Sequence, residues 1–117
     1  MEITLAKERH IPGILKLWKY LMDYHHGLDQ RGLLRRSKQG YVNFQKHLKK
    51  QLKSKRNQVL VTLDKDKVIA YSMAGIIDYP PIYILKKYGL ITNLCVDRAF
   101  QRKGIATRMM KEILAWF

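Results

Sequence analysis

The chain has 117 residues and a formal net charge of +14 at pH 7, and 47% of its residues are hydrophobic. This length fits one domain over 1–117, and the hydrophobic fraction is enough for a buried core, which excludes a disordered chain. The single cysteine excludes an internal disulfide framework and a multi-cysteine metal site, and it favours a reducing cytoplasm. No apolar run reaches the ~20 residues of a membrane span, and the N-terminus lacks the features of a signal peptide.

The first half of the chain predicts one short strand and two helices. The β-branched and apolar residues of 3–6 predict a strand. Apolar residues then recur with helical spacing from Pro12, which suits a first turn, to about His26, with Gly27 as the stop. A basic loop over 28–40 leads to a second helix with an apolar stripe opposite a lysine face. The stripe is Tyr41, Phe44, Leu48 and Leu52, and the opposite face is Lys46, Lys49, Lys50 and Lys53.

Positive charge is concentrated around this second helix. No Asp or Glu occurs from Arg31 to Arg56, and such a surface attracts phosphates, nucleic acid or an acidic protein. For Lys46 to Lys55 a solvated helix face is the explanation that we favour. The ten basic residues are Arg31, Arg35, Arg36, Lys38, Lys46, Lys49, Lys50, Lys53, Lys55 and Arg56.

The second half of the chain predicts three strands and a final helix. A tight turn over 64–67 joins the first two strands, so 59–77 is expected to be an antiparallel hairpin. Pro80-Pro81 bars a central strand at that point. The predicted order is β-α-α-β-β-β-α, and consecutive strands without intervening helices indicate an α+β fold. The predicted elements are strands over 59–63, 68–77 and 90–96, the last one buried, and a helix over 105–117 with Ile105, Met109, Ile113, Leu114 and Phe117 inward.

The most informative segment is the turn between the last strand and the last helix, Gln101-Arg102-Lys103-Gly104-Ile105-Ala106. The first N–H groups of a helix have no internal partner, and the helix dipole places partial positive charge there. Arg102 and Lys103 add full charges, and Gly104 allows a ligand to approach the backbone. The segment therefore predicts a phosphate site, although an ordinary turn on a basic protein explains the same residues.

With this turn after a strand, the chain resembles the GNAT superfamily of acyl-CoA-dependent N-acyltransferases. The family signature is Gln/Arg-x-x-Gly-x-Gly/Ala at the start of a helix, matched here by residues 101–106. The preceding Leu94 to Phe100 has the family's spacing from strand to turn, and Tyr79-Pro80-Pro81 to Tyr88-Gly89 resembles the family's connection between its third and fourth strands. The likeness covers essentially all 117 residues and implies a GNAT-like fold.

The resemblance implies an acetyl-CoA site at this turn and no metal. In the family, backbone N–H groups of the turn hold the coenzyme A pyrophosphate, and the pantetheine arm pairs with the end of the preceding strand. A bulge in that strand opens the groove, and a strand N–H polarises the thioester carbonyl. Carried over by position, the cofactor-binding residues are Leu94, Cys95, Val96, Gln101, Arg102, Lys103, Gly104, Ile105, Ala106 and Thr107.

The resemblance further implies acetyl transfer to a primary amine by direct attack, without an acyl-enzyme. An alkylammonium group with a pKa near ~10 must first lose a proton to a general base. Many family members carry Glu or Asp on the strand equivalent to 91–94, where this chain has Thr92 and Asn93. Asp78 could substitute, although a turn-capping role explains it better. Asp97 is expected to shape the turn before the motif, and the catalytic residues stay unassigned.

The family domain continues beyond the position of Phe117 with a strand, a helix bearing a tyrosine that protonates the leaving thiolate, and two more strands. The helix over 105–117 has no stop signal and ends on apolar residues. The last strand would keep an unpaired edge. We therefore expect a fold truncated after the helix that follows the fourth strand, present as a fragment, as a homodimer or with a second chain.

Other candidate residues have simpler explanations. Cys95 could be a nucleophile with His25, His26 or His47 as base, but its apolar strand favours a buried structural thiol. His25 and His26 do not share one helix face, so a helix-end role explains them better than a metal site. Residues that could border an acceptor or stack on a ligand are Tyr24, His25, His26, Arg31 to Arg36, Tyr79, Tyr83 and Tyr88.

Three functions therefore stay open. The first is an N-acetyltransferase, or part of one, that uses acetyl-CoA. The second is a non-catalytic module of the same fold that binds coenzyme A or a protein. The third is a nucleic-acid-binding protein that uses the basic face of 31–56, although no RNA-recognition aromatic motif or zinc finger is present.

Overall fold

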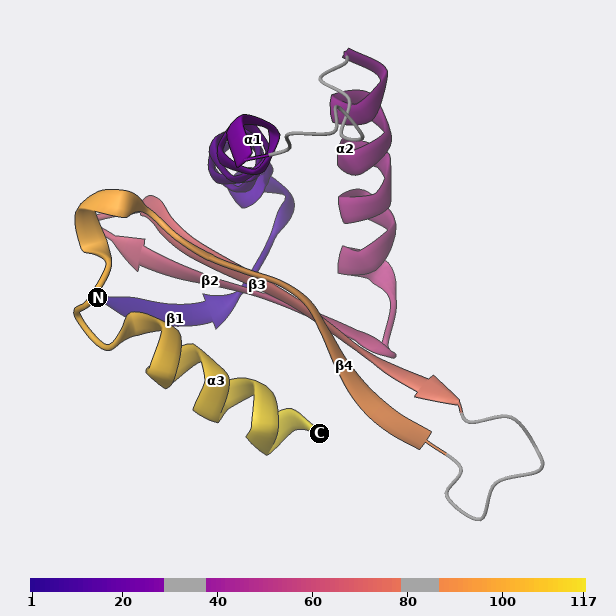
Figure 1. Cartoon of the computed structure of the whole chain (residues 1–117). Coiled ribbons are helices and arrows are strands. Elements are labelled where there is room, and N and C mark those ends of the chain that lie inside the picture. Colours follow the sequence, from indigo (N-terminus) through magenta and orange to yellow (C-terminus); the bar gives the residue numbers. More distant parts are fainter. Residues whose placement is uncertain (29–37, 79–86) are drawn as a thin grey trace.

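The computed structural model describes residues 1–28, 38–78 and 87–117, with side chains for 1–22, 40–78 and 87–117. One antiparallel sheet in the order β1-β2-β3-β4 forms the centre of the chain (Figure 1). The predicted order of strands and helices and the α+β class are confirmed. The elements are β1 (Glu2–Leu5), η1 (Glu8–His10), α1 (Ile11–Leu28), α2 (Lys38–Lys53), β2 (Asn57–Asp64), β3 (Lys67–Asp78), β4 (Lys87–Val96), η2 (Arg98–Phe100) and α3 (Ile105–Trp116).

Two glycines predicted outside helices lie within them. Helix α1 continues through Gly27 to Leu28, and α2 already includes Gly40. Each helix is longer than its predicted range by a turn or less. The exact ends of helices are the least certain part of a prediction from sequence. The rest of the predicted loop over 28–40 and the Pro80-Pro81 break fall in 29–37 and 79–86, outside the described residues.

Two hydrophobic cores lie on opposite faces of the sheet. Helices α1 and α2 cover one face and α3 covers the other (Figure 1). Strand β2 contributes side chains to both cores because successive residues point to opposite faces of the sheet. Val59 and Val61 face α1 and α2, while Leu60 faces α3. Between α1 and α2 the rings of Trp18 and Phe44 stack with centroids 4.5 Å apart and planes 6° apart. The predicted apolar stripe of α2 is therefore the face that packs.

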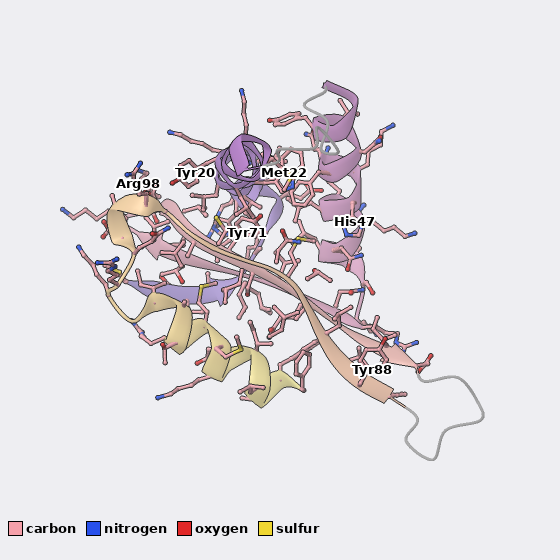
Figure 2. The ribbon with its side chains drawn as sticks, in the orientation of Figure 1. Tyr20, Met22, His47, Tyr71, Tyr88 and Arg98 are labelled. Atoms are coloured by element: carbon pink, nitrogen blue, oxygen red, sulfur yellow. The ribbon has the colours of Figure 1, made fainter. Side chains whose placement is uncertain are left out.

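The β2–β3 hairpin follows its turn chemistry. Lys65 and Asp66 have φ values of 50° and 69°, the left-handed conformations of a tight turn whose twist matches the flanking strands. A bulge after Thr62 in the pairing with β3 leaves Val68 in one core and Ala70 in the other. Tyr71 is fully buried on the α1 side of the sheet (Figure 2).

Two predictions of burial are wrong. Strand β4, expected to be buried, is exposed or half-buried along its length except at Cys95, because in the described sheet it pairs with β3 alone. Leu114 and Phe117, expected to face inward, are 61% and 43% exposed. The buried face of α3 is Ile105, Met109 and Ile113, a narrower stripe than the sequence suggests.

Protonation of His10 should destabilise the fold. His10 is buried, and its Nδ1 accepts a hydrogen bond of 3.0 Å from the Lys7 N–H. Burial, followed by the charges of Arg9 and Lys7, lowers the pKa of His10 below its ordinary value. The unfolded chain therefore binds this proton at a higher pH than the native state, so stability falls as pH drops below about 6.5.

Thermal melts between pH 7.5 and pH 5 measure this effect. We expect His10→Asn, which keeps an acceptor near Nδ1 but cannot ionise, to flatten the dependence of Tm on pH. His47→Asn, at an exposed position, should keep the wild-type slope. Parallel curves for wild type and His10→Asn would contradict the assignment.

Thr62→Val should stabilise the chain. The Thr62 side chain is fully buried, and its Oγ1 has no hydrogen-bond partner within the described residues. Replacing an unpaired buried hydroxyl by a methyl of similar shape is expected to gain about 1 kcal/mol, or about 4 °C in Tm. The control is Thr92→Val, which removes the Oγ1–H donated to the Met73 carbonyl at 3.3 Å and should lower Tm. A fall in Tm for both variants would refute the argument.

Candidate site at the N-terminus of helix α3

The end of β4 is held in place by three hydrogen bonds. The Asp97 N–H donates to the Ile69 carbonyl at 2.7 Å, which continues the pairing with β3 by one residue. The Asp97 Oδ1 accepts from the Ala99 N–H at 2.9 Å and so caps η2. The Gln101 Nε2 donates to the Val96 carbonyl at 3.2 Å and ties the turn back to the strand. The prediction that Asp97 shapes this turn is confirmed.

The backbone of the turn leaves a row of N–H groups free. Arg102 and Gly104 have φ values of 64° and 78°, and α3 begins at Ile105. The first helical hydrogen bond runs from the Arg108 N–H to the Gly104 carbonyl at 3.1 Å. Within the part of the chain that the structure describes, the N–H groups of 102–107 have no hydrogen-bond partner. Free amides at the positive end of a helix dipole form an anion-binding arrangement.

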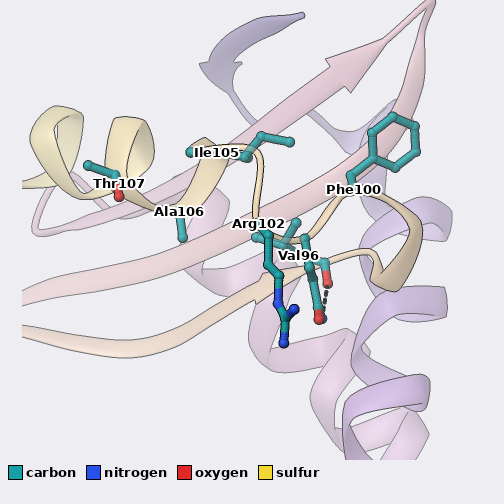
Figure 3. A pocket seen from close by; sticks show the side chains of 8 residues that line it. Val96, Phe100, Arg102, Ile105, Ala106 and Thr107 are labelled. Carbon is teal, nitrogen blue, oxygen red and sulfur yellow. Dashed lines mark hydrogen bonds between the residues drawn. The ribbon is translucent and has the colours of Figure 1, made fainter.

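A hollow of about 200 Å³ lies beside these amides (Figure 3). Arg102 and Lys103 are exposed at the turn, and the Lys103 Nζ lies 5.3 Å from the centroid of the Phe100 ring. A Cβ on Gly104 would have no atom within 4 Å, so this glycine keeps the approach to the backbone open. The lining residues are Val96, Phe100, Gln101, Arg102, Gly104, Ile105, Ala106 and Thr107.

Seven of the ten residues expected to bind the cofactor line the hollow, and three do not. Lys103 lies on the turn outside it, and Leu94 and Cys95 lie farther back along β4. Phe100 lines the hollow but was not among the expected residues. Its only signal in the sequence is an apolar side chain directly before a polar, basic turn.

The free edge of β4 offers backbone groups next to the hollow. The pairing of Asp97 with Ile69 fixes the alternation of the antiparallel ladder, so the N–H and C=O groups of Leu94 and Val96 point away from β3. Those of Cys95 point towards β3. The register shifts at Met73/Ala74, which leaves Thr92 of β4 as an extra residue opposite β3. The bulge expected in this strand is therefore present.

Cys95 is a structural thiol. Its side chain is 6% exposed, in the core under α1, and its Sγ–H donates to the Leu17 carbonyl at 3.8 Å. Burial, with a smaller contribution from the Asp97 charge, raises the pKa of Cys95 to about 11. A thiol with this pKa is almost wholly protonated at neutral pH and is a poor nucleophile.

Asp78 is committed to an ion pair at the far end of the hairpin. Both of its carboxylate oxygens accept from the Arg56 guanidinium, at 2.8 and 3.0 Å, and this contact lowers the pKa of Asp78. Asp78 pairs with Lys87 in the sheet register, about 30 Å along β4 from Val96. The turn that Asp78 was predicted to cap lies in 79–86, outside the described residues, so that role stays a prediction. The position of Asp78 and its lowered pKa both argue against a base at the hollow.

The residues at the usual position of the base are a threonine and an asparagine, each held by β3. The Thr92 hydroxyl donates to the Met73 carbonyl, and the Tyr71 hydroxyl donates to the Asn93 Oδ1 at 3.3 Å. Burial raises the pKa of Tyr71 above its ordinary value, so this phenol stays protonated. The Tyr71–Asn93 contact joins residues 22 apart, and no local sequence pattern signals it.

The structure describes only some of the other candidate residues. Within the described side chains, no group of three or more His, Cys, Asp or Glu is placed to hold a metal ion. The side chains of Tyr24, His25 and His26, like Arg31 to Arg36, Tyr79 and Tyr83, lie outside the described residues. Tyr88 is 38% exposed on β4. Of the helices that the structure describes, none is both long and apolar enough to cross a bilayer.

Arg102 holds a left-handed conformation that a residue with a Cβ adopts at a penalty. We expect Arg102→Gly to raise the stability of the ligand-free protein by about 1 kcal/mol, because glycine adopts positive φ without strain. Arg102→Ala removes the same charge but keeps the strain, so it should show no such gain in Tm. Equal Tm values for the two variants would show that the backbone is not strained here.

Comparisons with known proteins agree with this geometry. The family model "Acetyltransferase (GNAT) family" matches residues 16–117. The BH1408 protein of Bacillus halodurans, solved as a mutant, superposes with a TM-score of 0.86 at 24% identity, over 99% of this chain and 74% of that chain. Comparison with curated protein sequences finds no match.

Two further solved structures share the fold. An aminoglycoside 6'-N-acetyltransferase from Acinetobacter haemolyticus has a TM-score of 0.75 at 20% identity, over 99% of this chain and 70% of that chain. A predicted acetyltransferase from Clostridium acetobutylicum, solved with acetyl-CoA, has a TM-score of 0.77 at 19% identity, over 97% and 71%. Because the family model matches residues 16–117, which is most of this chain, the chain belongs to the GNAT acetyltransferase family.

Proposed function

We propose that the chain binds acetyl-CoA at the N-terminus of α3 and transfers the acetyl group to a primary amine. The observation that carries this proposal is the row of free N–H groups over 102–107, next to a hollow and two exposed cationic side chains. A diphosphate bridges adjacent amides well, because each phosphate oxygen accepts from an N–H that has no other partner. The similar fold solved with acetyl-CoA supports the choice of ligand.

The pantetheine arm would follow the free edge of β4. Leu94 and Val96 direct their backbone N–H and C=O groups to that edge, so an amide-containing chain could pair with them as a neighbouring strand does. The Val96 carbonyl already accepts from Gln101 and keeps one lone pair for a second donor. Cys95 would make no hydrogen bond to the pantetheine arm, since its backbone groups face β3 and its thiol is buried.

The reaction would be a direct aminolysis of the thioester. The nitrogen lone pair of the amine attacks the acetyl carbonyl carbon, the C–N bond forms, and the C–S bond breaks as coenzyme A leaves as a thiolate. The nitrogen loses one proton in this step, and the thiolate takes up a proton from solvent to give the thiol. An N–H on the β4 edge could stabilise the oxyanion of the tetrahedral intermediate. The amine must arrive neutral, and Asp78, Thr92 and Asn93 are all unsuited to take its proton. We assign no general base.

Replacing Gly104 tests the site directly. Acetyl-CoA at 100 times its Kd should stabilise the wild type by about 2.7 kcal/mol, read as a rise in Tm. Gly104→Asp places a carboxylate beside the bound diphosphate and should abolish this rise. The matched control is Gly104→Asn, which has nearly the same shape, tolerates positive φ and carries no charge, so it should keep a measurable part of the rise.

The proposal fails if millimolar acetyl-CoA leaves the wild-type Tm unchanged. It also fails at this site if Gly104→Asp and Gly104→Asn respond to acetyl-CoA equally. Titration calorimetry with desulfo-coenzyme A checks that the binding energy comes from the nucleotide and not from reaction at the thioester.

A non-catalytic binding module is the second candidate. The observation in its favour is that Thr92 and Asn93 of β4 carry no carboxylate, while Asp78 is held in an ion pair by Arg56. Release of coenzyme A thiol in the presence of amines separates the two functions. Aminoglycosides belong in that amine panel because solved relatives of this fold acetylate their 6'-amines. Stabilisation by acetyl-CoA without thiol release would favour the binding module.

A further inference from the structure

A second positively charged surface lies on the opposite face of the sheet from this site, on the solvent side of α2. Lys46, Lys49, Lys50 and Lys53 are all exposed, and their spacing places them on one stripe of the helix. In Figure 2, nitrogen-tipped side chains extend from α2 away from α1 and the sheet, around the labelled His47. We call these four lysines the α2 lysine stripe.

No acidic side chain offsets the α2 lysine stripe from within α2. The whole helix carries no Asp or Glu, and within the described residues no ion pair engages any of the four lysines. The nearby Arg56 is neutralised by Asp78. The stripe therefore presents uncompensated positive charge to solvent, and this charge is not needed to hold α2 in the fold.

The opposite face of α2 is fixed in the core, which excludes insertion into a lipid surface. Leu48 is fully buried and Phe44 stacks on Trp18. A helix that lies in a membrane interface must offer its apolar face to lipid, and α2 uses that face to pack against α1 and β2. Apart from Tyr41 and Val42 in its first turns, the exposed surface of α2 that a partner can reach is mainly the cationic face.

We propose that the α2 lysine stripe binds the phosphodiester backbone of a nucleic acid, without reading its sequence. Protein interfaces are depleted in lysine at their centre and use aromatic or arginine anchors, and the stripe has neither. Lysine acts on phosphate as a point charge, and backbone contacts of this kind carry no sequence information. Lys46 to Lys53 spans about 10 Å of helix, which matches about three phosphates of one strand.

This surface and the proposed acetyl-CoA site are independent. Helix α2 covers one face of the sheet and α3 the other, so both ligands can bind together. Failure of either proposal therefore leaves the other standing, and their tests can be read separately.

Fluorescence anisotropy with two labelled 20-base-pair DNA duplexes of mixed sequence tests the proposal on the full chain. For about three phosphate contacts on a duplex, the plot of log Kd against log salt should have a slope of about 2.7, so affinity falls roughly 40-fold between 50 and 200 mM salt. Two probes of unrelated sequence should bind alike.

The decisive variant changes Lys46, Lys49, Lys50 and Lys53 to Gln. Its matched control changes Lys16, Lys19, Lys67 and Lys111, which are exposed on other elements, to Gln and so removes the same net charge. We expect the stripe variant to lose most of the affinity and nearly all of the salt slope, while the control keeps the slope. Circular dichroism melts establish that both variants are folded.

Three outcomes would overturn the proposal. The first is no binding of either probe at 50 mM salt. The second is an equal loss of affinity in the two variants, which would show that net charge acts without a defined surface. The third is tighter binding of a polyglutamate peptide than of either duplex, which would indicate an acidic protein partner.

Discussion

The pairing of β4 with β3 positions the proposed site. Because the Asp97 N–H bonds to the Ile69 carbonyl, the chain leaves the sheet at one defined residue and in one direction. The Asp97 carboxylate and the Gln101 amide then hold the next turn against the strand. The free amides of 102–107 thereby lie beside the hollow at the end of β4, without hydrogen-bond partners among the described residues.

The sheet separates two kinds of positive charge. At α3 the charge is partly carried by the backbone, concentrated at one point and set beside a hollow, which suits a compact anion such as a diphosphate. At α2 the charge lies on flexible side chains along a stripe, which suits an extended polyanion. A net charge of +14 does not distinguish these cases, whereas its placement on the elements does.

Local sequence patterns predicted every α-helix and strand of the described chain, though not the short helices η1 and η2. One motif, also a local signal, predicted the free amides and the hollow at the N-terminus of α3 as the candidate site. Burial of β4 was mispredicted because its apolar residues resemble those of a central strand, and no local pattern shows how many neighbours a strand has. The Arg56–Asp78 and Tyr71–Asn93 contacts join residues that meet only through strand register. The positive φ of Arg102 was also missed, since arginine gives no conformational signal of the kind that glycine gives.

The two tryptophans of the chain lie on opposite sides of the sheet. Trp18 of α1 stacks on Phe44 of α2, while Trp116 at the end of α3 packs against the core on the other face. Their indoles are thus separate intrinsic fluorophores for the two layers, and a variant that keeps only one of them reports on one layer. Emission from a variant that keeps only Trp116 would report on the layer that carries the proposed site. Comparing its unfolding curve with that of a variant that keeps only Trp18 would show whether the two layers unfold in one transition.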